Sequence, residues 1–299
     1  MPDHKRLIEV IRNNQNFYIS HQDIEIALGK VLEKQEILRI YKSIGINLKN
    51  YNNSYRFRHF DFLQKRVIED RLSELTKLYK IRLEIEDIIE TTSRYFINEE
   101  VAEDSFSLCF AEFQTAGKGR GKNKWLSPFG SGICFSIAGT LPKKLSPLGL
   151  SIYCGIIIAS EFRKIGFEGV SLKWPNDLLD QEGNKVAGLL AEMAMDDGYV
   201  KHIILGIGLN VNQDTFPEEL PNPASLKGVY GHECDRASLL GKMVRRLRSV
   251  DLQDSMELWR QRSAMLGQKV VVQGKVGVAE AIREDGALIV DGRAILAAD

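Results

Sequence analysis

Apolar residues recur at helical spacing in three short stretches near the N-terminus, residues 5–12, 24–28 and 37–44. This spacing places the apolar side chains on one face of an amphipathic helix. The third stretch stops at Gly45, and glycine commonly follows the last turn of a helix. The pattern therefore predicts three consecutive short helices.

Apolar and polar residues then alternate in residues 46–48 and 55–57, on either side of the polar stretch 50–54. Such alternation predicts two strands joined by a polar tip. Three short helices and a hairpin within about 60 residues match the plan of a winged helix-turn-helix. Its expected recognition helix, residues 32–44, mixes acidic and basic side chains, so its charge for binding phosphates is modest.

A helical pattern over residues 67–79 leads into a region of short apolar strands and helices, with one long helix expected over 148–165. Polar turns at 181–184 and 196–198 indicate hairpins. We therefore predict a mixed or antiparallel sheet in an α+β fold, and not a doubly wound parallel sheet. The strands expected in this sheet are residues 81–85, 106–110, 133–137, 170–172, 189–193 and 202–211.

In the C-terminal part, the spacing of apolar residues predicts one more helix, which Asp235 caps, followed by a small β-structure. Four β-prone pieces follow Gly267, and about 32 residues bury little core alone, so we expect a small barrel docked on its neighbour. These pieces are residues 269–273, 276–282, 287–290 and 294–296. The chain then divides into a winged helix-turn-helix over 1–65, a central domain over 66–266 and the barrel over 267–299.

The composition is that of an ordinary globular chain, with 44% hydrophobic and 27% charged residues. The 40 basic residues balance the 40 acidic ones, so no net charge draws the whole protein to nucleic acid or to an anionic membrane. The uncharged stretches 125–142 and 145–160 are both shorter than the roughly 20 residues of a membrane helix. Charges in the first turn and a half also argue against a secretory signal. We expect a cytoplasmic protein without membrane attachment.

The four cysteines form no CxxC pair, and three of them lie in apolar runs. This pattern is typical of reduced thiols in a cytosolic core, and it disfavours disulfides or a thiolate metal site. The five histidines are scattered without HxxxH spacing, which excludes a histidine-based zinc enzyme.

The segment 114–125, QTAGKGRGKNKW, combines glycines at every second position with basic side chains. Glycine permits a positive φ angle and a close approach of the backbone to a ligand, and the basic side chains suit an anion. The segment lacks the glycine spacing and the Lys-Ser/Thr pair of a P-loop, and Lys122 stands where the dinucleotide fingerprint needs glycine. A flexible, solvated loop would have the same composition. This segment alone therefore does not distinguish an anion-binding loop from an ordinary surface loop.

Two further segments place polar residues at the ends of apolar strands. The Asn-Asp pair in KWPND, residues 173–177, offers oxygens for Mg²⁺ or for a polar substrate. Lys185 opens a small, glycine-containing strand, which places its ammonium at a sheet margin facing a cavity. Gly206 and Gly208 indicate a bulge or a ligand lying against the backbone, with Asn210 presented beside it. Taken separately, KWPND could be an irregular turn, and Lys185 could be a solvated lysine at a sheet edge. A binding site is favoured because the lysine, the Asn-Asp pair and the glycine-rich basic loop occur together among strands of one sheet.

In their order and spacing, these motifs resemble those of biotin protein ligases. Residues 112–130 resemble the family's adenylate-binding loop, and KWPND at 173–177, KVAGLLAE at 185–192 and GIGLNV at 206–211 follow as they do in the family. The resemblance covers residues 91–230 and extends more loosely to both ends. It implies a catalytic domain of the biotin/lipoate ligase type over 66–266, an SH3-like C-terminal barrel, and the N-terminal winged helix of the bifunctional ligase-repressors.

The resemblance also implies which residues bind the substrates. Lys185 and Arg120 are the implied catalytic residues, with Lys185 at the reacting carboxylate. The residues implied to bind biotin are Thr91, Thr92, Ser93, Gln114, Lys118, Gly119, Arg120, Trp125, Lys185 and Gly188. Those implied to bind ATP or the adenylate are Gly117, Lys118, Arg120, Trp125, Asn176, Asp177 and Asn210, and Asp177 is the implied Mg²⁺ ligand.

Three positions depart from the family pattern. Lys118 stands where the family has an arginine, which removes bidentate phosphate recognition at that position. Gly121-Lys122 inverts the usual order, and Ser93 replaces an asparagine that contacts the biotin head group.

The activity implied is that of an ATP-dependent biotin–protein ligase. With ATP and Mg²⁺ it would convert biotin to biotinyl-5′-AMP, and then transfer biotin to a lysine of a biotin carboxyl carrier protein domain of a carboxylase. The alternatives are a lipoate–protein ligase or octanoyl transferase of the same fold, against which KWPND and Gln114 stand, and a non-catalytic biotin-sensing repressor.

The N-terminal part raises the further expectation of a biotin-responsive transcriptional repressor. Residues 1–63 hold ten basic and seven acidic side chains, which is modest charge for binding a DNA operator. A helix-turn-helix can also serve as a protein-contact module. A homodimer is expected to form through the exposed strand around residues 190–195.

Overall fold

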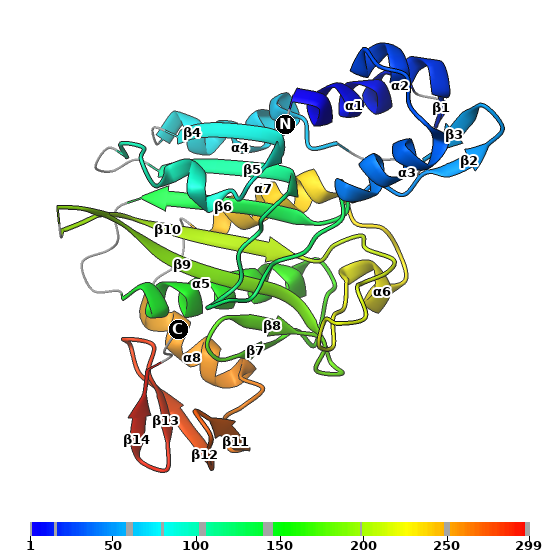
Figure 1. Ribbon diagram of the computed structural model, residues 1–299. Helices are drawn as coiled ribbons and strands as arrows, with labels where there is room; N and C mark the ends of the chain where they lie inside the picture. The colour runs from blue at the N-terminus through cyan, green and yellow to red at the C-terminus, as the bar shows by residue number, and fades with distance from the viewer. Residues whose placement is uncertain are drawn as a thin grey trace.

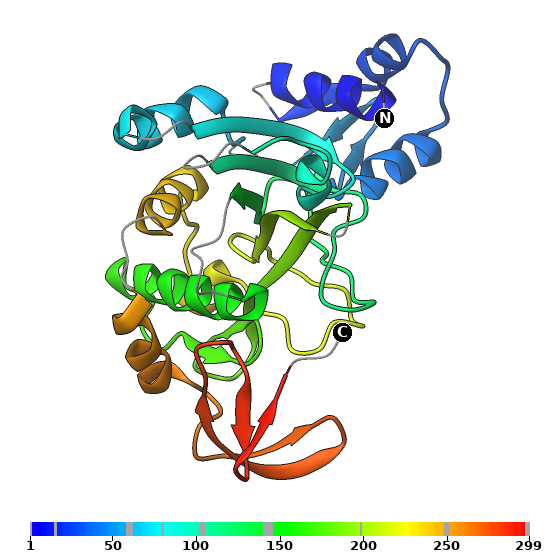
Figure 2. The ribbon, with the colours of Figure 1, turned by 90° about the vertical axis from the view of Figure 1, so that its left-hand side faces the viewer.

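The computed structural model describes residues 2–14, 17–57, 62–78, 81–101, 106–139, 146–197, 199–247 and 252–296. Three parts follow one another along the chain and through space, as Figure 1 and, turned by 90°, Figure 2 show. A small N-terminal helical part lies at one end, a seven-stranded sheet with helices forms the middle, and a four-stranded sheet lies at the other end.

The N-terminal part contains three helices and a three-stranded sheet of order β1-β3-β2. Ser20 and Asp23 form a capping box at the start of the second helix, which explains why that helix begins directly after a strand. Apolar side chains spaced along the helices fill a common core, as the spacing predicts. The elements are α1 (Pro2–Asn13), β1 (Tyr18–Ser20), α2 (His21–Leu28), α3 (Lys34–Ser43), β2 (Lys49–Tyr51) and β3 (Ser54–Arg56).

The predicted hairpin is placed a few residues too early on its first side. Residues 46–48 are not a strand; the strand is Lys49–Tyr51, and it turns at Asn52, which has a positive φ of 55°. Strand β1, Tyr18–Ser20, was not predicted, because three residues are too few to show alternation.

The N-terminal core does not end at its own elements. Ile88 of the central sheet and Phe129 are both buried within it, and Gly45 meets the backbone of Phe129 so closely that a Cβ atom would lie 2.7 Å from the Phe129 nitrogen. Ion pairs of Arg12 with Asp87 and of Lys5 with Glu86 add to this contact. The N-terminal part is therefore packed onto the central sheet.

The central sheet has the order β4-β5-β6-β10-β9-β8-β7. Only β4 and β5 are parallel, and all other neighbours are antiparallel, which confirms the predicted mixed sheet. The hairpin expected at 181–184 joins β8 to β9. Strands β9 and β10 pair antiparallel from Asp196 and Tyr199, in agreement with the hairpin expected at 196–198, of which residue 198 lies outside the described residues. The strands are β4 (Ile81–Ile89), β5 (Phe106–Gln114), β6 (Ile133–Gly139), β7 (Ser171–Lys173), β8 (Asp177–Leu179), β9 (Lys185–Asp196) and β10 (Tyr199–Leu209).

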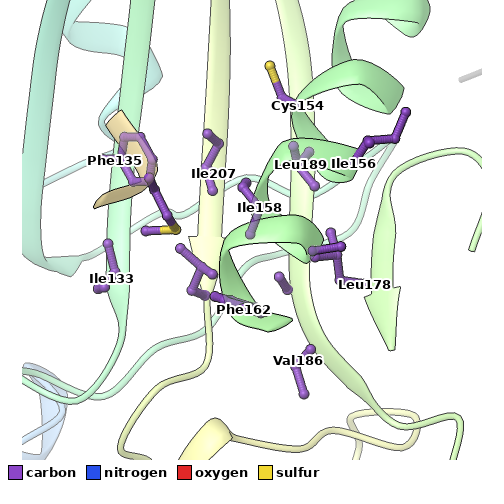
Figure 3. Close-up of a cluster of buried hydrophobic side chains, with 14 of the residues drawn as sticks. Ile133, Phe135, Cys154, Ile156, Ile158, Phe162, Leu178, Val186, Leu189 and Ile207 are labelled. Carbon is purple, nitrogen blue, oxygen red and sulfur yellow. The ribbon is translucent and has the colours of Figure 1, made fainter. Parts of the chain in front are cut away.

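The two faces of this sheet differ in side-chain size. Side chains that face the helices are large and apolar, and Figure 3 shows Phe135, Ile207 and Leu189 from three neighbouring strands packed against the long helix α5 (Pro147–Lys164). The intervening residues face the other side, and several of them are small, for example Ser136 and Gly206. Because successive residues of a strand point to opposite faces, one face forms the core and the other is left open for a ligand.

Four longer helices and two short ones complete the central part. Ser146 caps α5 and Pro147 occupies its first turn, and Asp235 caps α7 as predicted, with the Ser238 nitrogen donating to Asp235 Oδ1 at 2.8 Å. No helix in the described ranges is long and apolar enough to cross a membrane. The remaining helices are α4 (Lys65–Leu78), α6 (Leu226–Tyr230), α7 (Arg236–Leu247), α8 (Leu252–Arg262) and the 3₁₀ helix η1 (Ser93–Phe96).

The C-terminal sheet pairs in simple order, β11-β12-β13-β14, close to the expected pieces. It contacts the central part through Trp174, whose Nε1 donates to the Gly286 carbonyl at 2.8 Å, and through Ser146, whose hydroxyl donates to the Asp285 carbonyl at 2.6 Å. Gly286 has a φ of 89° and no room for a Cβ atom, so its contact with α5 requires glycine. The strands are β11 (Lys269–Val272), β12 (Lys275–Ile282), β13 (Leu288–Val290) and β14 (Arg293–Ile295).

Candidate active site

A cleft of about 870 Å³ opens on the small-residue face of the central sheet. The strand register orders its floor across the sheet: Ser136 pairs with Gly206, Gly208 pairs with Gly188, and Gly188 pairs with Asp177. Of the site residues expected from the sequence, all except Gly117 line this cleft. These are Thr91, Thr92, Ser93, Gln114, Lys118, Gly119, Arg120, Trp125, Asn176, Asp177, Lys185, Gly188 and Asn210.

The two strand glycines of the GIGLNV motif are not in a bulge. Gly206 and Gly208 pair regularly with both neighbouring strands, and the register shift in β10 lies between Val200 and His202. A Cβ atom on Gly208 would lie 2.3 Å from the Trp125 ring. Gly208 is therefore required by a ring of the protein itself that lies against the sheet. The expected bulge is wrong, and the other interpretation, a ligand lying against the backbone, stays a prediction.

Residues 117–125 form a small hairpin that covers part of the cleft. The Trp125 nitrogen donates to the Gly117 carbonyl and the Gly119 nitrogen to the Asn123 carbonyl, both at 2.9 Å, and Lys118 pairs with Lys124. Of the three glycines only Gly121 has a positive φ, 61°. Gly117 is required for a different reason, because a Cβ atom would lie 2.5 Å from the Trp125 carbonyl.

Lys118 binds a carboxylate of the neighbouring strand. Its Nζ lies 3.0 Å from Glu192 Oε1, and the other oxygen, Oε2, is buried without a hydrogen-bond partner. An arginine fork could contact both oxygens, whereas the single ammonium contacts one. The lysine that replaces the family arginine therefore links the hairpin to β9.

Buried polar groups gather where β4, β5 and β6 meet. Thr91, Thr92 and Ser93 are each at most 4% exposed. Gln114 Oε1 accepts hydrogen bonds from the Thr92 nitrogen at 2.7 Å and from its hydroxyl at 3.2 Å. The Thr92 hydroxyl is also 2.7 Å from Ser136 Oγ. The result is a preformed hydrogen-bonding surface in which the Gln114 amide is held by the protein.

A lysine and a carboxylate face each other farther along the floor. Lys185 Nζ lies 2.6 Å from Asp177 Oδ1 and 5.7 Å from the centre of the Trp125 ring. Asn176 holds this part of the loop, since its Nδ2 donates to the Leu189 carbonyl at 2.7 Å. The expected position of Lys185, at a sheet margin facing a cavity, is confirmed.

Asn210 is largely used by the protein itself. Its Nδ2 donates to the Lys185 carbonyl at 3.3 Å, and its Oδ1 accepts from Gln213 Nε2 at 3.2 Å. The residue is 5% exposed. It fixes the first residue of β9 in place, in addition to lining the cleft.

Trp174 of the KWPND motif has a structural role. Its ring is 7% exposed and lies in the central core, and its Nε1 bonds to Gly286 of the C-terminal sheet. No local pattern explains a tryptophan at this turn, because its partner Gly286 lies more than 100 residues away along the chain.

Cys134 of β6 is a buried thiol close to Trp125. Burial raises the pKa of its thiol to about 11, although nearby Trp125 and Ser127 favour the thiolate. A thiol with such a pKa is protonated near neutral pH and is a poor nucleophile. The expectation that Cys109, Cys134 and Cys154 are core thiols is confirmed, since all three are buried.

Sequence reasoning missed several polar residues of the cleft, among them Ser136 and Glu192. Ser136 sits inside an apolar strand and differs from its neighbours only by being polar at a position that faces away from the core. Glu192 ends the KVAGLLAE motif, where its charge in an otherwise apolar strand was the available signal.

Comparison with known proteins agrees with these motifs. The model of the Biotin/lipoate A/B protein ligase family matches residues 87–210. The bifunctional ligase/repressor BirA of Escherichia coli is 30% identical over 222 residues, which cover 70% of this chain and 69% of BirA. BirA of Bacillus subtilis is 30% identical over 259 residues, which cover 79% of this chain and 74% of that BirA.

A solved structure has the same fold. The biotin protein ligase of Aquifex aeolicus, in complex with biotin and ATP, superposes with a TM-score of 0.62 at 27% identity, covering 72% of this chain and 96% of that one. The family match coincides with the strands that line the cleft, and the similarity to BirA extends over more than two thirds of either protein. The chain belongs to the biotin/lipoate A/B protein ligase family.

Proposed function

We propose that this protein is an ATP-dependent biotin–protein ligase, which transfers biotin to a lysine of a biotin carboxyl carrier protein domain. The observation that supports this most is the distribution of polar groups along the cleft. Gln114 and its hydroxyl partners lie over β5 and β6, the Lys185–Asp177 pair lies over β8 and β9, and a glycine floor separates them. This layout fits a ligand with a polar ring, an apolar chain and a terminal carboxylate.

In the first step, an oxygen of the biotin carboxylate attacks the α-phosphorus of ATP. A new O–P bond forms, the bond to pyrophosphate breaks, and biotinyl-5′-adenylate results. Two anions have to meet, so catalysis consists mainly of positioning and of neutralising charge. Lys185 stabilises the charge at the carboxylate and the α-phosphate, and Arg120 of the hairpin supplies a second cation.

Asp177 and Asn176 would hold Mg²⁺, which when bound neutralises phosphate charge. In the described part of the chain, no group of three or more His, Cys, Asp or Glu could hold a metal ion by itself. One carboxylate fits a Mg²⁺ ion that arrives with the nucleotide, because Mg²⁺ keeps several waters and takes one or two carboxylates beside substrate phosphates.

In the second step, the neutral amine of the acceptor lysine attacks the acyl carbon of the mixed anhydride. The C–O bond to the phosphate breaks, AMP leaves, and an amide forms after loss of the amine proton. The hairpin 117–125 keeps water from the anhydride until the acceptor arrives. No covalent enzyme intermediate is involved, in agreement with the raised pKa of Cys134.

Pyrophosphate exchange with biotin or lipoate tests this proposal. Buried polar groups left unpaired cost roughly 1–3 kcal/mol each, and the dithiolane ring of lipoate offers Gln114 no hydrogen bond. We expect exchange with biotin and far less with lipoate. Equal exchange with both acids would support a lipoate–protein ligase, and no exchange with either would support a non-catalytic biotin sensor.

The N-terminal part is proposed to be a winged helix-turn-helix, with α3 as recognition helix and the β2–β3 hairpin as wing. The outward residues Lys34, Arg39 and Lys42 of α3 are exposed, so they are available for phosphates. Regulation of the protein's own promoter in response to biotinyl-adenylate would follow. A dimer is proposed through the outer edge of residues 190–195, with which no strand of the described ranges pairs.

Substitution of α3 tests this role better than deletion of residues 1–63, because deletion would expose Phe129 and Ile88. Lys34, Arg39 and Lys42 are changed together to alanine in the full chain. We expect loss of the gel shift on the promoter while pyrophosphate exchange continues. An unchanged gel shift would exclude α3 as the recognition helix.

The C-terminal sheet is proposed to be an SH3-like barrel, and the domain limits 1–65, 66–266 and 267–299 are proposed with it. Gln273 Nε2 donates to the Leu296 carbonyl at 3.2 Å, which brings the turn after β11 to the end of β14. Dependence on ATP and four free cysteines support action in the cytoplasm.

A further inference from the structure

Ser136 is a fully buried polar residue of β6 whose hydroxyl joins the head-group end of the cleft. Its exposed fraction is 0%, and its Oγ lies 2.7 Å from Thr92 Oγ1. Thr92 in turn contacts Gln114. Three polar side chains from β6, the segment after β4, and β5 therefore form one chain of contacts.

The direction of each hydrogen bond in this chain follows from counting protons. The Thr92 backbone nitrogen can only donate, so the Gln114 atom 2.7 Å away is its oxygen, Oε1. That oxygen is also 3.2 Å from the Thr92 hydroxyl, which must donate its one proton there. The Thr92 oxygen is then an acceptor toward Ser136, and Ser136 donates.

The orientation of the Gln114 amide follows from the same count. With Oε1 occupied by two donors from Thr92, the NH₂ group is the part of the amide left for a ligand. Nε2 lies beside the hairpin, where a Cβ atom on Gly117 would be 3.1 Å from it. The cleft thus presents a donor at this point.

We infer that Ser136 is a positioning residue for head-group selectivity: by donating to the Thr92 oxygen it holds the Thr92 hydroxyl where it donates to Gln114 Oε1, and so supports the orientation in which the Gln114 NH₂ group meets the ligand. The inference rests on the proposed function, in which Gln114 meets the ureido group of biotin. A ureido carbonyl accepts from this NH₂ group. A cyclic guanidinium, which carries only donors at the same place, is repelled by it.

The test compares biotin with 2-iminobiotin, its cyclic guanidine analogue, in pyrophosphate exchange at neutral pH. Wild type should prefer biotin. In Ser136→Ala the Thr92 hydroxyl loses the hydrogen bond that anchors it beside Gln114, and the preference, measured as the ratio of kcat/KM values, should fall about five- to tenfold, since one hydrogen bond contributes an effect of that size. The KM for ATP should not change.

Ser136→Thr is the matched rescue variant. It keeps the hydroxyl and adds one methyl group. Gly206 on the paired strand leaves room for this methyl group, since even a Cβ atom added to Gly206 would be 3.7 Å from Ser136 Oγ. Thr92→Ser and Thr92→Val form a second pair that keeps or removes the middle hydroxyl. Ser107→Ala, on the neighbouring strand and also buried, is the control for loss of a serine from the sheet.

The outcomes separate the inference from the proposed function. A lower biotin preference in Ser136→Ala and Thr92→Val, restored in Ser136→Thr and Thr92→Ser, supports the role of Ser136. The inference would be overturned if Ser136→Ala lowered kcat/KM equally for biotin and for 2-iminobiotin, or if Ser107→Ala lowered the biotin preference by the same factor. If wild type fails to exchange with biotin at all, the proposed function fails instead.

Discussion

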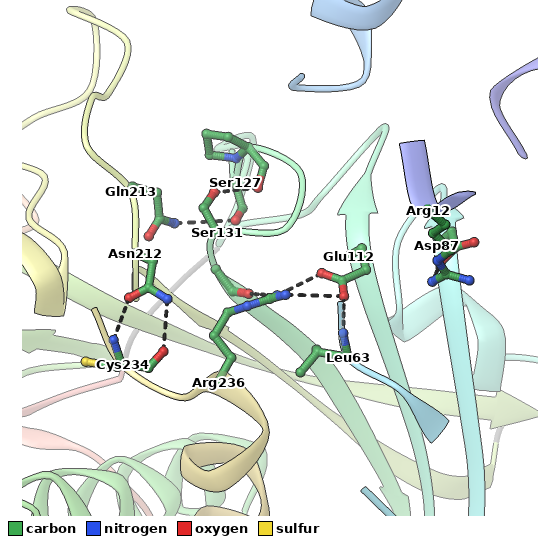
Figure 4. A network of polar contacts seen from close by, with 12 residues as sticks. Arg12, Leu63, Asp87, Glu112, Ser127, Ser131, Asn212, Gln213, Cys234 and Arg236 are labelled. Atoms are coloured by element: carbon green, nitrogen blue, oxygen red, sulfur yellow. Dashed lines mark hydrogen bonds and ion pairs between the residues drawn. The ribbon is translucent and has the colours of Figure 1, made fainter. Parts of the chain in front are cut away.

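The ion pair of Arg236 and Glu112 offers a sharp test of how the central sheet is stabilised. Both side chains are 0% exposed, with Arg236 Nη1 2.7 Å from Glu112 Oε2. Nη1 also donates to the Gly132 carbonyl at 2.9 Å, and Glu112 accepts from the Leu63 nitrogen. Figure 4 shows these contacts converging on β5, two residues before Gln114.

Removing only one partner should be costly. Arg236→Met leaves the Glu112 carboxylate buried without its cation, which costs about 3–5 kcal/mol of unfolding free energy. The double variant Arg236→Met with Glu112→Gln has no buried charge, and the glutamine carbonyl can still accept from Leu63. Its main loss is the donor to Gly132, about 1–3 kcal/mol. The double variant should therefore be more stable than Arg236→Met alone.

Urea unfolding followed by tryptophan fluorescence measures this difference, since Trp259 is buried. With an m value of about 3 kcal/mol/M, Arg236→Met should lower the midpoint by about 1 M or more. Arg283→Met removes an arginine from an exposed ion pair and should cost no more than about 1 kcal/mol. A double variant no more stable than Arg236→Met would refute the reasoning that uncompensated charge dominates.

Three further outcomes are expected. Lys185→Gln should lower the rate of adenylate formation about 10²- to 10³-fold without loss of fold, measured by pyrophosphate exchange and circular dichroism, whereas Lys201→Gln should not. Arg120→Gly should still form the adenylate but release it, so that lysines of added albumin become biotinylated; labelling confined to the true acceptor would contradict this. Burial lowers the pKa of His202 from 6.5, so protonation of this histidine favours the unfolded state. The free energy of unfolding should therefore decrease as the pH falls below 6.5 toward the lowered pKa. His202→Asn should reduce this acid-side loss in urea titrations at several pH values, and an unchanged slope would exclude His202 as its source.

Much of the molecule follows from local patterns. The longer helices of the first 165 residues, helix α7 and most strands lie where the spacing of apolar residues puts them, because each element has to bury its apolar face. Helices α6, α8 and η1 and strand β8 were not predicted. The hairpin 117–125 and Lys185 are recognisable in the chain because the chemistry there depends on residues close together in sequence. The positions of strand ends and of β1 were missed, since two or three residues carry no period.

Other features exist only once the chain is folded. Glu112 and Arg236 are 124 residues apart, and Lys118 and Glu192 are 74 apart, so no local pattern joins them. Ser136 becomes part of the site because β6 pairs beside β10 and turns its small residues to the open face. Strand pairing decides which residues meet, and a pairing register is a property of two distant segments together. For this protein, the sequence by itself determined the elements and the reactive motifs, and the tertiary structure decided which buried groups hold those motifs in place.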